Sequence, residues 1–161
     1  MEVPHVPESA GIETREVDVR KLLPYAAGSV DRIYTEHFVE HLTRIEGGRF
    51  FAECARVMKS GAFIRISTPD LAAVIEAYCE NALDRWSAVG FISATRAQLV
   101  NDSLTMWGHR FTYDFEELRM SLELAGMVDV KRRPHGDTVA PGMLTEGRPF
   151  CQDLIVEGRK P

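Results

Sequence analysis

The segment between residues 30 and 71 constrains the fold most, because strand and helix signals alternate along it without interruption. Val30–Thr35 (VDRIYT) is a run of strand-forming residues bounded by turn residues, and Ala62–Ser67 (AFIRIS) has the same character. Between them, Thr43 and Glu46 have the T-x-x-E spacing of a helix N-terminus, and apolar residues then recur at helical spacing. A strand, a helix and a second strand in this order predict an α/β domain with a largely parallel sheet.

The connection between these two strands fixes where the helix must lie. Crossovers between parallel strands of one sheet are right-handed, so we expect residues 30–35 and 62–67 to pair in parallel, with the helix near 44–58 on one sheet face. The residues expected to point inward from this helix are Phe51, Cys54 and Met58. Ser60-Gly61 is expected to stop it, because glycine readily adopts the left-handed conformation at a helix end.

The rest of the chain carries weaker signals of the same two kinds. Short strands are expected at residues 12–19, 127–132 and 153–157, and helices from Pro69 onward, across 92–104 and from Asp114 to Gly126. A long loop rich in glycine and proline precedes the last strand, and loops of this length are often functional.

Charge and cysteine content exclude several functional classes. The chain has 161 residues, with 19 Lys and Arg against 24 Asp and Glu and a net charge of −5, so neither nucleic acid nor an anionic membrane is an expected partner. The three cysteines are far apart and form no C-x-x-C pair, which disfavours a disulfide framework or a cysteine zinc site. No apolar run reaches the roughly 18 residues of a membrane helix, and the N-terminus has no secretory signal. We therefore expect a cytoplasmic protein.

Several motifs follow one another between Asp18 and Leu71, and their order is more specific than any one of them. After Asp18 they are Leu23-Pro24-Tyr25, Ser29-Val30-Asp31, Glu40-His41-Leu42, Arg56-Val57-Met58-Lys59-Ser60-Gly61 and Thr68-Pro69-Asp70-Leu71. In this order the segment resembles class I, Rossmann-like S-adenosylmethionine-dependent methyltransferases.

The resemblance implies a Rossmann-like methyltransferase fold, with a mostly parallel sheet and an antiparallel C-terminal strand, and methyl transfer from S-adenosylmethionine. The family's glycine-rich loop of the type G-x-G-x-G, where the backbone approaches the cofactor closely, has no counterpart in this sequence. We therefore expect a truncated version of the fold, a single domain over residues 1–161 that lacks the first strands. We also expect weak or absent S-adenosylmethionine binding by this chain.

The missing first strand has a physical consequence for the sheet. In the family it lies beside the strand placed here at residues 30–35, whose edge would otherwise be unpaired. Unpaired strand edges recruit another strand or aggregate. We therefore expect a homodimer, or a partner that covers this edge, and the alternative is that residues 1–19 fold back over it.

The resemblance also assigns roles to residues on the cofactor side. Asp18 would accept a hydrogen bond from the adenine amino group, and a turn-capping role is the alternative. Thr35 and Glu36 would line the cofactor crevice, because ligands of such sheets bind at the carboxyl ends of strands. His37 and His41 are the candidate acid–base residues, since imidazole exchanges a proton near neutral pH. For His41 a packing role at the start of a helix is the alternative.

A dense aromatic and cationic cluster between residues 107 and 113 is the candidate for the methyl-acceptor side. The residues expected there to bind substrate are His109, Arg110 and Tyr113, together with Thr68 at the end of the second strand. The alternative is a structural connection that packs two aromatic rings on the sheet edge.

His37 and His41 also form the pattern H-x-x-E-H, in which two histidines on one helix share a zinc ion. The methyltransferase resemblance already accounts for Glu40-His41-Leu42, and no third ligand has the proper spacing, although Glu36 or His109 are candidates. We therefore expect no metal at His37 and His41.

Two functions remain open on the sequence alone. The first is an S-adenosylmethionine-dependent methyltransferase acting on a small-molecule or carbohydrate-like acceptor, which the retained Asp18, His37 and His41 favour. The second is a non-catalytic methyltransferase-like binding or assembly module, which the lack of a glycine-rich loop favours.

Overall fold

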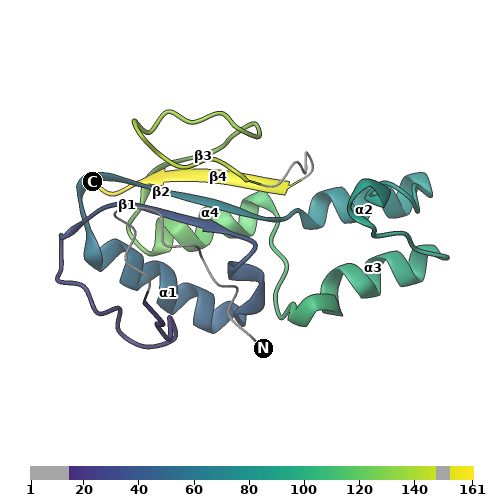
Figure 1. Cartoon of the computed structure of the whole chain (residues 1–161), viewed down its shortest axis with the longest axis horizontal. Coiled ribbons are helices and arrows are strands. Elements are labelled where there is room, and N and C mark those ends of the chain that lie inside the picture. Colours follow the sequence, from purple (N-terminus) through teal and green to yellow (C-terminus); the bar gives the residue numbers. More distant parts are fainter. Residues whose placement is uncertain (1–14, 148–152) are drawn as a thin grey trace.

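The computed structural model describes residues 15–147 and 153–161, and these form one four-stranded sheet with helices (Figure 1). The strands are β1 (Val30–Glu36), β2 (Met58–Pro69), β3 (Val128–Arg132) and β4 (Asp153–Arg159), in the order β1-β2-β4-β3. β1 pairs with β2 in parallel, and β4 is antiparallel to both β2 and β3. Three strands therefore share a direction and the C-terminal strand opposes them, which confirms the predicted α/β sheet.

Two capped helices cover one face of this sheet, α1 (Arg44–Val57) and α4 (Phe115–Leu124) (Figure 1). At the start of α1 the Thr43 side chain accepts from the Glu46 backbone N–H, and the Glu46 carboxylate accepts from the Thr43 backbone N–H. At the start of α4 the Asp114 carboxylate accepts from the Glu117 backbone N–H. The predicted helices at these positions are confirmed.

The boundaries of two elements differ from those expected. α1 ends at Val57 rather than at Ser60-Gly61, because Met58 is already extended and begins β2. Gly61 does adopt a positive φ of 79°, but within the irregular start of β2, where the register with β1 shifts. Pro69 closes β2 instead of opening a helix, and Asp70 caps α2 (Leu71–Glu80). Residues 15–19 form no strand, and residues 12–14 of that predicted strand lie outside the described residues.

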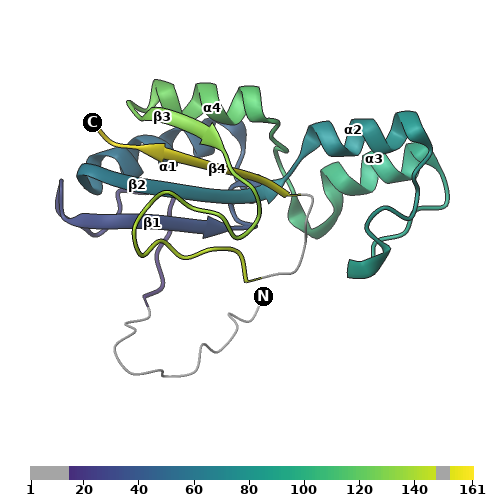
Figure 2. The same ribbon diagram turned by 90° about the horizontal axis from the view of Figure 1, so that it is seen from above.

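α2 and α3 (Arg96–Thr105) form a hairpin that projects beyond the end of the sheet (Figures 1 and 2). The two helices pack on each other rather than on the sheet, so the predicted apolar stripe of α2 is only partly buried. Val74 is buried, whereas Ile75 and Tyr78 are exposed. Over residues 15–147 and 153–161 there are also three short 3-10 turns between the longer elements: η1 (Val39–His41), η2 (Ser87–Val89) and η3 (Met106–Gly108).

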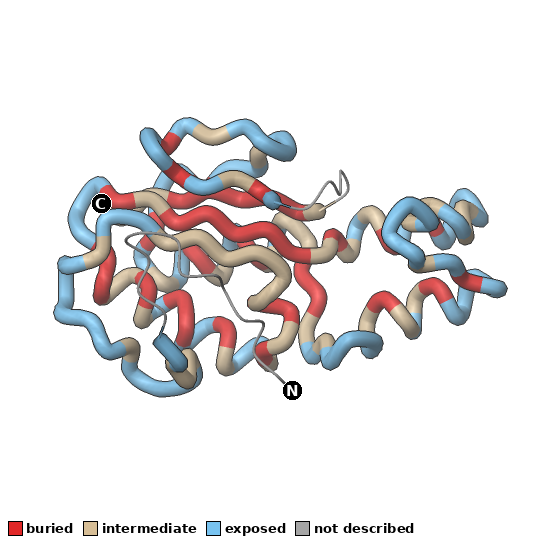
Figure 3. Tube along the Cα trace, in the orientation of Figure 1, coloured by how far each residue is buried: buried red, intermediate tan, exposed pale blue. Residues whose placement is uncertain are grey.

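The apolar core lies between the sheet and the helices α1 and α4. Figure 3 shows β2 and β4 buried along most of their length, as expected for central strands covered on both faces. The strand residues that face the helices include Ile64, Ile66, Leu154 and Val156, and the helix residues that meet them include Phe51, Cys54, Leu118 and Leu122. The inward positions predicted for Phe51, Cys54 and Met58 are confirmed, since all three are fully buried.

The opposite face of the sheet is held by buried charges instead of helices. Arg65 on β2 lies directly across from Glu157 on β4 and is fully buried. Its guanidinium donates to both oxygens of Glu146 at 2.7 and 2.9 Å, to Glu157 Oε1 at 2.7 Å and to the Asp137 carbonyl at 2.7 Å. Arg65 thus fastens the loop of residues 133–147 onto the sheet (Figure 2).

Gly47 in α1 is required by close packing rather than by conformation. A Cβ at this position would lie 2.4 Å from the hydroxyl oxygen of Tyr113, which is itself buried. Tyr113 is held in place by edge-on contacts with the rings of Phe51 and Phe111. The adjacent Gly48 has no neighbouring atom within 4 Å of such a Cβ.

The Arg65 network predicts a large loss of stability when its cation is removed. Arg65→Met removes the cation shared by the buried Glu146 and Glu157 carboxylates and leaves Glu157 with Arg133 as its only ion-pair partner among the described residues, which costs about 3–5 kcal/mol of unfolding free energy. Arg159→Ala breaks the exposed pair with Asp129 and serves as a control, with a change of at most about 1 kcal/mol. Urea denaturation measures both, and equal small effects would contradict the role of Arg65.

The same network predicts a dependence of stability on pH. Burial alone would raise the pKa of Glu157, but hydrogen bonding from Thr138 and Arg65 outweighs it and holds this pKa below its ordinary value of 4.5. The ionised carboxylate therefore stabilises the fold at pH values above its ordinary pKa, and this stabilisation is lost as the pH falls through the lower pKa of the native state. We expect Arg65→Met to lose less stability than the wild type on acidification, and an unchanged loss would contradict the assignment.

Paired glycine substitutions in α1 test the packing against Tyr113. Gly48→Ala raises the unfolding free energy by about 0.5–1 kcal/mol through helix propensity. Gly47→Ala lowers it by about 1–3 kcal/mol, because the new methyl group overpacks the core. In a Tyr113→Phe background the Gly47→Ala penalty shrinks, since the clashing oxygen is gone. Thermal melting compares these variants with the wild type, and a stabilising Gly47→Ala would contradict the close approach.

β1 ends the sheet, and in the part of the chain that the structure describes no strand pairs with its outer edge. The expectation of self-association therefore stays a prediction. We expect sedimentation at high micromolar concentration to give a dimer, because pairing satisfies backbone groups that cost about 1–3 kcal/mol each when buried without partners. A monomer at that concentration would contradict it and favour coverage of the edge within one chain.

Candidate functional site

A pocket of about 470 Å³ opens where the carboxyl ends of β1 and β2 meet the α2–α3 hairpin. Because β4 is antiparallel, its first residue Asp153 pairs with the last residue of β2, Pro69, and so also reaches this edge. The residues that line the pocket come from η1, the strand ends, the hairpin and the segment after α3; they are His37, Glu40, His41, Pro69, Asp70, Val74, Trp86, Val89, Phe91, Ser103, Trp107, His109 and Asp153.

His37 directly follows β1 and bridges two carboxylates. Its Nε2 lies 2.9 Å from Asp153 Oδ2, and its Nδ1 lies 3.3 Å from Glu40 Oε1. Burial disfavours the imidazolium, but the nearby carboxylates of Asp153 and Glu40 outweigh it and raise the pKa of His37 to about 9. His37 has a φ of 48°, a conformation that is strained for a non-glycine residue and that occurs preferentially at functional sites.

Glu40 is fully buried at the base of the pocket and ties three segments together. Its Oε2 accepts a hydrogen bond from the Thr68 hydroxyl at 3.0 Å, and its carbonyl accepts from the backbone N–H groups of Arg110 and Phe111. Burial would raise the pKa of Glu40, but His37 outweighs it and lowers the pKa. Glu40 Oε1 has no hydrogen bond of good geometry within the described residues.

Aromatic rings form the wall of the pocket on the side of the hairpin. Trp86 and Phe91 lie 6.2 Å apart between ring centroids, Phe91 and Trp107 lie 5.4 Å apart, and Trp107 and His109 lie 5.6 Å apart. The His109 ring meets the His41 ring edge-on at 5.2 Å. Trp107 is 59% exposed and has a φ of 56°, so the backbone is strained here as well.

The structure brings some of the predicted acceptor-side and acid–base residues together and separates others. His37, His41 and His109 all line the pocket, and Thr68 lies behind it, bonded to Glu40. Arg110 does not line the pocket: its Nη1 forms an ion pair with Glu46 Oε2 at 2.9 Å. Tyr113 is packed in the core.

The predicted cofactor-side residues do not lie together: Thr35 and Glu36 are the last two residues of β1, whereas Asp18 lies in the loop before this strand. Asp18 is clamped by Arg20, whose Nε and Nη2 donate to its two oxygens at 2.8 and 3.1 Å and lower its pKa. Thr35 Oγ1 is buried and has no hydrogen-bond partner within the described residues. Glu36 Oε2 accepts from the Gly147 backbone N–H at 3.4 Å.

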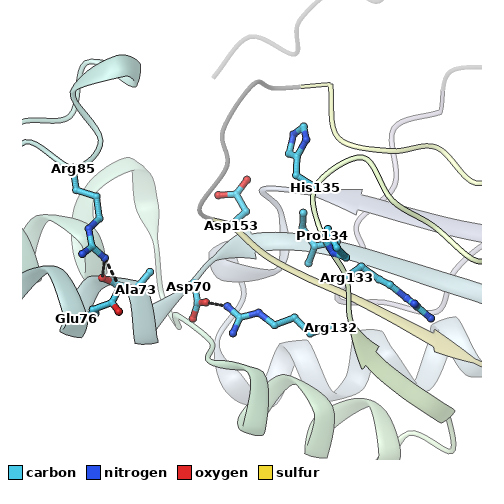
Figure 4. Close-up of a pocket in the computed structure, with 10 residues that line it drawn as sticks. Asp70, Ala73, Glu76, Arg85, Arg132, Arg133, Pro134, His135 and Asp153 are labelled. Carbon is cyan, nitrogen blue, oxygen red and sulfur yellow. Dashed lines mark hydrogen bonds and ion pairs between the residues drawn. The ribbon is translucent and has the colours of Figure 1, made fainter.

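A second, more polar pocket of about 480 Å³ adjoins the first and shares Asp70 and Asp153 with it (Figure 4). Asp70 is bonded to Arg132 from β3, and Arg85 pairs with Glu76 of α2. Both ion pairs are drawn in Figure 4. Asp70 and Asp153 therefore lie at the boundary between the aromatic pocket and the charged pocket.

Sequence reasoning did not select Glu40, Asp153, Trp86 or Phe91 as site residues. Asp153 had a usable signal, since the first residue of an antiparallel C-terminal strand must lie at the carboxyl edge of its parallel neighbours. The sequence indicates Glu40 only as a member of the Glu40-His41-Leu42 and H-x-x-E-H motifs. Trp86 and Phe91 belong to a segment without periodicity, and nothing in the sequence places them beside Trp107.

Comparisons with known proteins agree with this architecture. Residues 2–66 match the family model described as a methyltransferase domain. A S-adenosylmethionine-dependent methyltransferase from Archaeoglobus fulgidus has 16% sequence identity and a TM-score of 0.57, with 91% of this chain and 66% of that chain covered. A possible histamine N-methyltransferase from Thermotoga maritima has 16% identity and a TM-score of 0.56, with 94% and 65% covered. The structure named "PigF with SAH" has 14% identity and a TM-score of 0.52, with 89% and 34% covered.

These findings confirm the resemblance at the level of the fold: the chain has the Rossmann-like fold of class I S-adenosylmethionine-dependent methyltransferases. The chain spans about two thirds or less of the length of these structures. No curated protein matches the sequence. Among the residues described, no helix is both long and apolar enough to cross a membrane.

Proposed function

We propose that this protein takes part in methyl transfer from S-adenosylmethionine and that the aromatic pocket holds the methyl acceptor. The observation that carries the proposal is the pocket at the carboxyl ends of β1 and β2, the edge at which ligands of such sheets bind. Its floor contains a paired set of ionisable groups, the buried Glu40 with the partly buried His37 and Asp153, and such sets are characteristic of functional sites.

The residues on β1 fit one wall of a cofactor site. The orphaned Thr35 hydroxyl at the carboxyl half of the strand suits a polar ligand atom, since a buried hydroxyl without a partner is unfavourable. Thr35 and Asp18 are the residues that would hold the cofactor, whose sulfonium supplies an electrophilic methyl group. The residues of this chain would bind and orient the acceptor and exclude water from it.

The lining of the pocket favours a small acceptor with an apolar face and a polar group. The rings of Trp86, Phe91 and Trp107 offer apolar surface, and the carboxylates of Glu40 and Asp153 offer hydrogen-bond acceptors. A small-molecule or carbohydrate-like acceptor meets both requirements. The exposed free thiol of Cys79 and the excess of acidic residues accord with a cytoplasmic protein that does not bind nucleic acid.

One observation favours the second candidate, a methyltransferase-like binding module without catalysis. The Asp18 carboxylate is already occupied by Arg20, and the sequence contains no glycine-rich G-x-G-x-G loop. A chain in this state would keep the acceptor pocket and bind its ligand without transferring a methyl group.

Calorimetric titration with S-adenosylhomocysteine measures how much of the cofactor site this chain supplies, and turnover then separates the two functions. We expect no saturation at micromolar concentration, because the residues that fit the cofactor supply only one wall of its site. Micromolar affinity would contradict this expectation and favour an active enzyme. Turnover is then followed as S-adenosylhomocysteine formed from millimolar S-adenosylmethionine with sugars, phenols and amines as acceptors.

Trp107→Ala tests the pocket itself. It removes an exposed ring from the pocket wall and should raise the KM for any accepted substrate, whereas the control Leu124→Ala, at an exposed position of α4 outside the pocket lining, should leave it unchanged. Equal kinetics for Trp107→Ala and the wild type would contradict the acceptor pocket.

A further inference from the structure

We propose that Glu40, His41 and His109 form a binding site for a divalent transition-metal ion, for which Zn²⁺ is the best match. Each of the three residues offers one ligand atom, and these atoms all lie within 4.8 Å of one another. The residues come from two segments far apart in the sequence, η1 and the stretch after η3, which the hydrogen bonds from Arg110 and Phe111 to the Glu40 carbonyl hold together.

Two of the three ligands are already oriented for coordination. His109 Nδ1 lies 2.9 Å from the Ser103 carbonyl, to which it donates, and this leaves the Nε2 lone pair free for a metal. Glu40 Oε2 accepts from the Thr68 hydroxyl, which leaves Oε1 to face the pocket. Metal-binding histidines and carboxylates are characteristically fixed in this way by hydrogen bonds from their second polar atom.

The lack of a hydrogen-bond partner for Glu40 Oε1 among the described residues is the observation that indicates a ligand. This oxygen is fully buried, carries no hydrogen bond of good geometry within the described residues and lies 3.9 Å from His41 Nε2. The nearest cation, His37, approaches it only to 3.3 Å. The His41 side chain is 36% exposed, which leaves its ring room to turn toward an ion.

The donor set determines which ion fits. Two imidazole nitrogens and one carboxylate oxygen suit Zn²⁺, whereas Mg²⁺ and Ca²⁺ prefer oxygen ligands alone. Bonds of about 2.0–2.2 Å would draw the three ligand atoms closer together. A tetrahedral ion would keep its fourth position open to the pocket, where a water molecule or an oxygen of a bound ligand can occupy it.

This site differs from the one that the sequence pattern suggested. In H-x-x-E-H the two histidines would share the ion, but both nitrogens of His37 face carboxylates, those of Asp153 and Glu40. The site proposed here replaces His37 by the glutamate of the motif and adds His109, so it departs from the expectation of a metal-free chain. It does not depend on methyl transfer.

Zinc retention by the full chain tests the proposal directly. The protein is loaded with Zn²⁺, dialysed against metal-free buffer and analysed for metal content, and the affinity is measured by competition with a chromogenic chelator. We expect stoichiometric zinc in the wild type and an affinity at least about tenfold lower in His109→Ala and in His41→Ala. The matched control is His135→Ala, an exposed histidine outside the cluster, which should keep the wild-type affinity.

Folding and metal binding are separated by a second measurement. Glu40 is buried, so Glu40→Gln is interpreted only if its near-ultraviolet circular dichroism matches that of the wild type. We also expect Zn²⁺ to raise the melting temperature of the wild type and of His135→Ala but not of His109→Ala. The proposal would be overturned if the wild type retained no zinc, or if His109→Ala and His41→Ala both kept the wild-type affinity.

Discussion

The Glu40 carboxylate is the point at which the separate parts of this small fold meet. Its side chain contacts Thr68 on β2 and His37 after β1, and its carbonyl receives two backbone N–H groups from the segment that leads into α4. An ionised carboxylate with no exposure is tolerated only when such partners surround it. The burial of Glu40 therefore requires the strand ends and the segment from Arg110 to Phe111 to stay together, and the pocket is the space that this arrangement leaves.

The two faces of the sheet are stabilised by opposite means. On one face, α1 and α4 bury apolar side chains against β2 and β4, in the manner of any α/β domain. On the other face, Arg65 and its two glutamates bind a loop without helices. A buried ion-pair network contributes little net stability compared with apolar packing, but it fixes geometry strictly, because an unsatisfied member is very unfavourable. The loop of residues 133–147 is thus held in one position, and this loop also forms part of the charged pocket.

The sequence predicted the parts of the molecule that follow from local chemistry. The capping residues Thr43 and Asp114, the paired strands and the buried stripe of α1 depend on short-range patterns, and they were found where expected. The predicted start of α2 is two residues too early, because Pro69 satisfies the preferences of a strand end as well as those of a first helical turn. The site was predicted in part: His37, His41 and His109 lie together, yet Asp153 and the aromatic wall come from long-range packing that no periodicity encodes.

The aromatic wall gives the protein an internal optical reporter. The chain contains two tryptophans, Trp86 and Trp107, and both line the same pocket. Indole emission from the whole molecule therefore originates at this one place and nowhere in the core. Any ligand, ion or shift of the α2–α3 hairpin that alters the polarity around these rings will change the fluorescence of the unlabelled protein, without a contribution from tryptophan elsewhere.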